Sequence, residues 1–369
     1  MSGPSYVLES PSPSAPLPEV RNHTRFPSQY FQMLDTDDHI YHAMVMRVTY
    51  DLQQLDPLGF PALARKQPPL LDADQFYGQP NTSSPIQESD FAPYKPRCDI
   101  VFAHANAYAP QGIPTARWPI AAKVGDWTKY LMVCGPRWIR PGALGWKLDE
   151  PEAAAEVCIQ YENAFGGTCK WPEILPDGVE AEILSHFPSN PVGCGFFDKQ
   201  WVKKAEPKQI KAPQIEVIDR VFDRHSISSQ DYPAVGLGCV GRWWQPRAQL
   251  AGSYDEQWKK SRLPALPKDF DFGYWNSVPM DQQIKYPKGG EKIHLVGLTP
   301  GGGHFLARLP ENHPYTLVTL DAGPILKRPM PIDTLIFDMR DMTLTCAHRT
   351  NVASNAGIRM IEVAQDRKE

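Results

Sequence analysis

Proline restricts the fold of this chain more than any other residue type. The sequence holds 38 prolines among 369 residues, about twice the average usage. Each proline removes a backbone hydrogen-bond donor and fixes φ at about −65°, which shortens helices and interrupts central strands. The sequence therefore predicts short secondary-structure elements joined by long ordered loops.

The apolar residues indicate strands more often than helices. Residues 40–52 are rich in β-branched and aromatic side chains with partial alternation, which is typical of a strand. Further strands are predicted at 98–103, 129–134, 157–161, 292–298, 315–320 and 334–339. Short helices are predicted at 152–157, 253–262 and 281–286. We expect a mainly β protein with few short helices and long Pro/Gly-rich loops, whose sheets form a sandwich or a barrel.

The composition, 42% hydrophobic and 22% charged, is that of a folded chain. Residues 1–28 contain a Ser/Pro-rich run and are predicted to be a flexible tail. Residues 29–345 are predicted to form the main domain, with a division into two β subdomains at the lysine-rich stretch 199–211 left open. Residues 346–369 are predicted to be a separate C-terminal segment.

The net charge of −4 gives no basic field that would attract nucleic acid. The seven cysteines are scattered and include no CxxC pair, which is typical of reduced thiols in a cytosol. The N-terminus carries no signal-peptide pattern, and no stretch approaches the ~18 consecutive apolar residues of a membrane-spanning helix. We therefore expect a cytoplasmic protein that binds neither nucleic acid nor membrane.

Two glycine-rich segments are candidates for cofactor sites. Gly236–Gly241 formally matches G-x-G-x-x-G, but that fingerprint leads from a strand into a helix, and Pro233 and Pro246 flank it here. Gly297–Gly303 lacks the Lys-Ser/Thr of a phosphate-binding loop and is predicted to be a hairpin turn. No cofactor is expected.

Metal and nucleophile sites are equally weak. The best local group of possible metal ligands comprises Asp35, Asp37, Asp38, His39 and His42. This group lacks the glycine of a calcium loop and the HExxH spacing, so it is predicted to be a solvated acidic turn. Cys194 lies between two glycines, and His186 or His225 could act as its base, but a free cysteine is more often buried and inert. Neither a metal nor a catalytic residue is expected.

Residues Trp243–Trp275 combine many aromatic side chains with acids, which allows two interpretations. Aromatic platforms beside paired carboxylates would suit a glycosidase or a sugar-binding groove, whereas buried aromatics would form a core. Exposed aromatics and arginines are also typical of protein-binding hot spots. The candidates for partner contact are Trp243, Trp244, Arg247 and Trp258. The charged residues Lys95, Arg137, Glu162 and Asp269 are predicted to form internal ion pairs and loop clamps.

Several long motifs occur in the order found in one bacterial family. They include Ser83–Val101, Tyr161–Gly167, Asn190–Phe196, Trp244–Arg247 and Gly252–Asp271. The chain, from about residue 31 to about residue 340, resembles a family known as a domain of unknown function and encoded beside type VI secretion spike genes. Cys346–Arg349 stands where the family pattern has a Trp-Arg pair, so the final strand is expected to pack differently.

The resemblance implies a non-enzymatic adaptor or chaperone. Such a protein would bind a toxin effector and promote its loading onto VgrG and a PAAR-type tip protein. The alternative is a polysaccharide-acting enzyme or carbohydrate-binding module that uses the Trp243–Trp275 region. A third hypothesis makes this chain itself a delivered effector.

Overall fold

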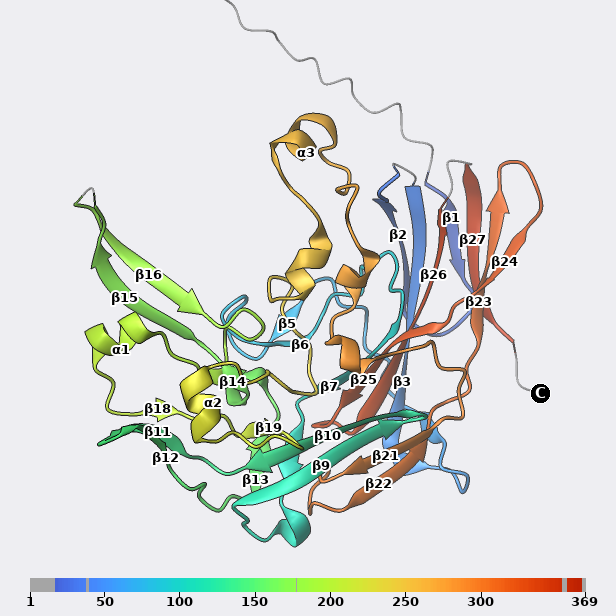
Figure 1. Cartoon of the computed structure of the whole chain (residues 1–369). Coiled ribbons are helices and arrows are strands. Elements are labelled where there is room, and N and C mark those ends of the chain that lie inside the picture. Colours follow the sequence, from blue (N-terminus) through green and yellow to red (C-terminus); the bar gives the residue numbers. More distant parts are fainter. Residues whose placement is uncertain (1–16, 38–39, 177, 354–356, 367–369) are drawn as a thin grey trace, which may run out of the picture.

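In the computed structural model, which describes residues 17–37, 40–176, 178–353 and 357–366, most of the regular structure is strand. Within these ranges the α-helices are short: α1 (Lys199–Ala205), α2 (Arg224–Ser229) and α3 (Glu256–Ser261). The predicted mainly β fold is therefore confirmed (Figure 1). None of the helices in the described part of the chain is long and apolar enough to cross a membrane.

The largest sheet has seven strands and joins both halves of the sequence. Its order is β2-β3-β26-β25-β7-β20, with β4 beside β3. The strands are β2 (Ser28–Leu34), β3 (Ile40–Leu55), β4 (Pro61–Leu63), β7 (Cys98–Ala103), β20 (Gln283–Ile284), β25 (Ile332–Asp338) and β26 (Thr343–Ala353). Most neighbours are antiparallel, whereas β25 runs parallel to β7.

Two further sheets complete the main body. One has the order β19-β10-β9-β21-β22 and the other β1-β27-β23-β24. The first contains β9 (Arg117–Val124), β10 (Trp127–Cys134), β19 (Ile215–Val217), β21 (Lys292–Val296) and β22 (His304–Arg308). The second contains β1 (Glu19–Asn22), β23 (Pro314–Leu320), β24 (Leu326–Pro329) and β27 (Ile358–Gln365).

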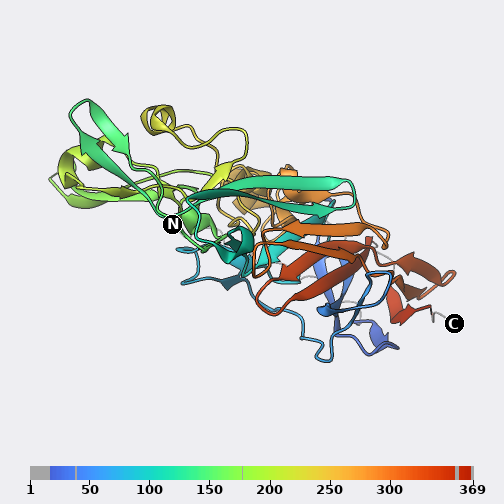
Figure 2. The same cartoon turned by 90° about the horizontal axis from the view of Figure 1, so that it is seen from below.

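The main core forms where one face of each sheet is buried. Met46 on β3, Ile120 on β9, Phe337 on β25 and Ile361 on β27 belong to one apolar cluster. Side chains alternate between the two faces of a strand, so each sheet supplies every second residue to this core. Figure 2 shows the five-stranded sheet lying over the seven-stranded sheet. The predicted β-rich fold with several sheets is thus confirmed, and the sheets share one core.

The middle of the chain builds a second, smaller core. It includes Phe165, Phe222 and Tyr232, whose ring centroids lie 5.3–5.8 Å apart. The strands around it are β11 (Trp138–Gly142), β12 (Gly145–Leu148), β14 (Phe165–Gly166), β15 (Thr168–Ile174), β16 (Glu180–His186), β17 (Cys194–Gly195) and β18 (Ile210–Lys211). Residues 199–211 contain α1 and β18 and lie within this part of the molecule, so they do not mark a boundary between subdomains.

The remaining elements are short and lie within the loop regions. They are the strands β5 (Gln75–Phe76), β6 (Pro85–Gln87), β8 (Asn106–Tyr108) and β13 (Glu156–Cys158), and the 3-10 helices η1 (Pro110–Gly112), η2 (Tyr161–Asn163), η3 (Arg247–Ala251), η4 (Phe272–Trp275) and η5 (Met280–Gln282). The high proline content thus coincides with many short elements, as predicted.

Most predicted strands are confirmed, since β3, β7, β10, β21, β23 and β25 cover six of the seven segments. The segment 157–161 is strand only to Cys158, and η2 begins at Tyr161. The helix predicted at 152–157 was wrong. Ala154 instead forms a β-bridge with Thr115, and β13 pairs with β8, because strand partners outweigh weak helix propensity.

The predicted terminal segments also differ from the structure. Within the expected flexible tail, β1 pairs in parallel with β27 and Phe26 is buried, while residues 1–16 lie outside the described residues. The boundary predicted after residue 345 falls inside β26, so 346–369 is not a separate segment. Both errors have one cause, because pairing between the two ends of a chain leaves no local sequence signal.

Candidate functional site

The outer face of the seven-stranded sheet is covered by loops that carry charges, most of them buried and one pair, Arg242–Asp74, partly buried. We call these charges the clamp layer. Its ion pairs are Arg47–Asp90 (3.0 Å), Lys95–Asp99 (2.8 Å), Arg242–Asp74 (2.9 Å), Arg247–Glu88 (2.5 Å) and Arg349–Asp333 (2.5 Å). Buried charges are stable only when they are paired and hydrogen-bonded. The pairs therefore fix the positions of the loops on the sheet.

Asp99 is the best-satisfied carboxylate of the clamp layer. It accepts hydrogen bonds from Lys95 Nζ, Asn276 Nδ2 and the backbone N–H of Ser277, each at 2.8 Å. Lys95 also donates to Thr334 Oγ1 at 3.0 Å. Burial by itself lowers the pKa of Lys95, but the charges of Asp99 and Asp333, together with the hydrogen bond to Asp99, outweigh burial and raise that pKa above its ordinary value. The ammonium group stays charged and acts as a structural cation.

Two of the four candidates for partner contact are buried. Arg247 is only 4% exposed, and besides Glu88 it donates to the backbone oxygens of Val240 (2.7 Å) and Tyr274 (2.9 Å). Trp244 is 1% exposed and packs edge-on against Tyr161, with ring centroids 5.5 Å apart. Their proposed contact with a partner was wrong, because both side chains are used inside the fold.

Trp243 and Trp258 stay candidates for partner contact. Trp243 is 42% exposed and meets His186 with its ring centroid 6.2 Å away. Trp258 is partly buried and donates from Nε1 to the oxygen of Ala265 at 2.8 Å. Tyr254 covers Trp258 at a centroid distance of 4.7 Å.

The other charged motif residues lie in internal contacts. Glu162 accepts hydrogen bonds from the backbone N–H (2.7 Å) and the hydroxyl (2.6 Å) of Ser84. Asp269 likewise accepts from the N–H (3.0 Å) and hydroxyl (2.7 Å) of Ser253. Glu162 holds its loop to the distant Ser84, and Asp269 holds its loop to Ser253, so both act as loop clamps.

Two arms extend from the body in Figure 1. The hairpin arm consists of β15, β16 and their connecting turn, and the α3 arm comprises residues 252–270. Both arms carry large apolar side chains that are more than half exposed, namely Ile174 and Leu184 on the hairpin arm and Leu263 on the α3 arm. Trp243 meets the hairpin arm through His186 at the end of β16.

The acids of the Trp243–Trp275 region cap short helices or hold turns. Asp255 accepts from the N–H of Trp258 at 2.7 Å, and Asp271 accepts from the N–H of Gly273 at 2.7 Å. Asp269 holds Ser253, as described above. Capping uses the lone pairs of each carboxylate locally. The geometry therefore gives each of these acids a local structural role.

Cys194 does not have the environment of a nucleophile. Burial raises the pKa of its thiol to about 12, so the reactive thiolate is scarce at neutral pH. Its sulfur lies 3.7 Å from the backbone oxygen of Ala164. Of the two histidines considered as its base, His186 contacts the ring of Trp243.

The glycine-rich segments are structural. A Cβ at Gly241 would lie 2.6 Å from Nε1 of Trp244, so this glycine gives room for the buried indole. Gly297–Gly303 connects β21 to β22 and is closed by a 3.0 Å bond from Gly297 N–H to Gly303 O, as predicted for a hairpin turn. No group of three metal-ligating side chains occurs among the described residues, which leave out Asp38 and His39.

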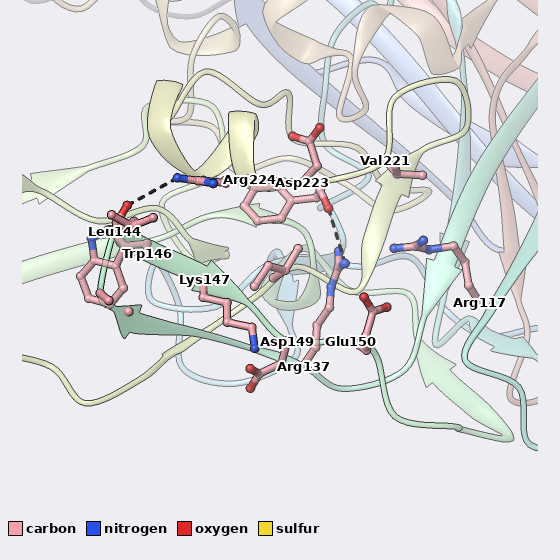
Figure 3. Close-up of a pocket in the computed structure, with 15 residues that line it drawn as sticks. Arg117, Arg137, Leu144, Trp146, Lys147, Asp149, Glu150, Val221, Asp223 and Arg224 are labelled. Atoms are coloured by element: carbon pink, nitrogen blue, oxygen red, sulfur yellow. Dashed lines mark hydrogen bonds between the residues drawn. The ribbon is translucent and has the colours of Figure 1, made fainter.

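A cavity of about 560 Å³ lies between the β11–β12 hairpin and the segment that leads into α2 (Figure 3). Its walls include the apolar side chains of Leu144, Trp146, Leu148, Val221 and Phe222. The guanidinium groups of Arg117 and Arg137 point toward one another at one end (Figure 3).

A buried carboxylate lies behind the two arginines. Glu216 forms ion pairs with Arg137 and, at 3.5 Å, with Arg117. Burial raises the pKa of Glu216, and the two guanidinium groups oppose that rise. Sequence reasoning selected Arg137 but missed Arg117 and Glu216. No local signal could have found them, because the three residues come from separate strands and loops.

Comparison with known proteins identifies the family of this chain. No curated protein and no solved structure matches this chain. One family model matches residues 37–349, which include most strands of the three sheets and all of the clamp layer. The chain therefore belongs to the family described as "Uncharacterized protein conserved in bacteria (DUF2169)".

Proposed function

We propose that this protein is an accessory adaptor or chaperone of the type VI secretion system. It binds a toxin effector and promotes loading of that effector onto the VgrG/PAAR spike, by binding alone. The ordered motifs described above support the link to secretion. The observation that carries the binding role is the pair of arms, with exposed Ile174, Leu184 and Leu263.

Exposed apolar side chains on projecting elements favour a partner. Large side chains with a polar surrounding are typical of protein-binding surfaces. The clamp layer supports this role, because it fixes the loops next to the α3 arm through Arg247 and Tyr274. A surface that is rigid before binding loses less conformational entropy when the partner arrives.

The test is affinity purification of the tagged protein from its native bacterium at physiological salt, followed by mass spectrometry. We expect a toxin-like protein together with a VgrG or PAAR component. Leu184→Asp and Leu263→Asp, one on each arm, should lose the effector. Leu306→Asp is the matched control, since Leu306 is similarly exposed but lies on β22, away from both arms. Equal recovery by all variants, or recovery of neither component by the wild type, would contradict the proposal.

We also propose a cytoplasmic location, which cell fractionation tests. The alternative of a polysaccharide-acting protein gains no support from the capping acids Asp255, Asp269 and Asp271. Hydrolysis or binding in a glycan panel would revive it. Detection of the chain itself in the secreted fraction would instead favour a delivered effector.

A further inference from the structure

The cavity of Figure 3 combines apolar walls with a cationic end. We propose that it binds an acidic side chain carried by an apolar peptide segment of the protein partner. This inference rests on the proposed function only for the source of the peptide. The volume of about 560 Å³ lies within the ~300–1,000 Å³ range of pockets that enclose small ligands.

The cationic end has unused hydrogen-bonding capacity. Arg137 Nε is buried without a hydrogen-bond partner, and Arg117 Nε lies 3.5 Å from Glu216 Oε2 without forming a hydrogen bond to it. Buried polar atoms in native proteins are nearly always paired with protein, water or ligand. The two Nε–H groups beside one cavity, one unpaired and one only loosely paired, therefore indicate a place for a polar ligand that accepts hydrogen bonds.

The charge at this end favours an anion. Two guanidinium groups share the single carboxylate of Glu216, so the cluster carries a net positive charge. The side chain of Arg117 is about one third exposed, so it can reach a ligand in the cavity. Arginine recognises carboxylates well because its planar group can donate two parallel hydrogen bonds.

The acids around the cavity are engaged, with one exception. Asp149 pairs with Arg140 at 2.7 Å. Asp223 accepts from the N–H of Ser226 and caps α2, and these bonds lower its pKa. Glu150 is exposed and lies near the two guanidinium groups in Figure 3. The negative charge of Glu150 repels an incoming anion. Removing that charge should therefore strengthen ligand binding, which is opposite to the effect expected from removing an arginine.

The apolar walls favour one kind of peptide segment around the acidic side chain. Leu144, at the exposed turn of the β11–β12 hairpin, and Val221 both present aliphatic surface at the cavity. Trp146 adds an aromatic face. A hydrophilic acid alone would leave these walls in water, whereas leucine-like neighbours of the acid would cover them. The favoured ligand is therefore an acidic residue flanked by apolar residues.

The probe is the acetylated, amidated tripeptide leucine-aspartate-leucine, and its asparagine analogue is the neutral control. Binding is measured by isothermal titration and by the fluorescence of Trp146, whose contribution Trp146→Phe removes. We expect the asparagine analogue to bind at least about tenfold more weakly, because a charge-assisted hydrogen bond is lost. Arg117→Gln should weaken the aspartate peptide similarly, and Glu150→Gln should strengthen its binding.

Arg340→Gln, at an exposed arginine outside the cavity, is the matched control and should leave binding unchanged. The inference falls if both peptides bind equally, if neither binds, or if Arg117→Gln and Glu150→Gln shift the affinity in the same direction. Peptide binding with no effector in the purification would sustain the site and remove the proposed function. If wild type and Arg117→Gln retain the effector equally and no peptide binds, the proposed function would be supported and the peptide site would be contradicted.

Discussion

Replacement of Arg247 by methionine should destabilise the fold rather than remove a binding contact. The guanidinium group donates to Glu88, Val240 O and Tyr274 O inside the clamp layer. Methionine fills similar space but supplies neither the charge nor the donors. Glu88 would then be left as a buried carboxylate, and two carbonyl oxygens would lose their donor.

The magnitude follows from what remains around Glu88. Removing one partner of a buried ion pair costs about 3–5 kcal/mol. Arg242 Nη2 lies 3.3 Å from Glu88 and would compensate in part. We therefore expect a loss of about 3 kcal/mol for Arg247→Met. The matched control, Arg242→Met, removes a more exposed arginine from the same network and should cost about 1–2 kcal/mol.

Urea unfolding followed by tryptophan fluorescence measures this difference. A chain of this size can unfold in more than one step, so hydrogen exchange of residues 84–90 and 240–247 should be measured as well. Exchange there should rise strongly in Arg247→Met. The double variant Glu88→Gln, Arg247→Met should cost less than the sum of the single changes, because the two side chains are coupled. A cost below about 1 kcal/mol for Arg247→Met, or an equal cost for both arginines, would refute the reasoning.

The other predictions concern Lys95, His348, the cysteines Cys158 and Cys194, and Trp243. Lys95→Met should also cost about 3–5 kcal/mol in urea unfolding, because it leaves Asp99 buried without its cation. Burial lowers the pKa of His348 to about 4, so the unfolded chain binds the proton more readily; stability should fall as pH drops from about 6.5 to 4, and less so in His348→Gln. Iodoacetamide at pH 8 should modify the exposed Cys158 well before Cys194, as peptide mass spectrometry would show. Trp243→Ala should change unfolding by about 1 kcal/mol or less while it reduces recovery of the effector, and a loss of stability without a loss of binding would contradict that role.

The sequence predicted the strands better than it predicted their neighbours. β7 matches its predicted bounds, because its β-branched and aromatic composition is a local property. The pairing of β1 with β27 is not local, and so the N-terminal strand was mistaken for part of a tail. The predicted boundary at 345 failed for the same reason, since β26 is defined by its partners β3 and β25.

The same limit applies to the site. The internal role of Lys95 and Glu162 could be expected from charge alone, because a fold rich in loops needs buried ion pairs. Partners distant in sequence could not be expected, since Glu162 holds Ser84 and Arg247 pairs with Glu88, which is 159 positions away, whereas Lys95 pairs with Asp99 within the same motif. An aromatic-rich segment likewise does not reveal which ring is exposed, and Trp243 and Trp244 are neighbours with opposite burial.

The motifs and the candidate binding surfaces occupy largely different parts of the chain. The motifs 83–101 and 244–247 build the clamp layer, so likeness in them reports mainly on the fold. The motif 252–271 is the exception, because it forms the α3 arm, where Asp255 and Asp269 hold the backbone and Leu263 faces outward. The hairpin arm, by contrast, lies outside these motifs, whereas the cavity includes the motif residue Arg137 at its cationic end. If the proposed adaptor role holds, we therefore expect the α3 arm to contact what different members of the family bind in common, and the hairpin arm to distinguish one effector from another.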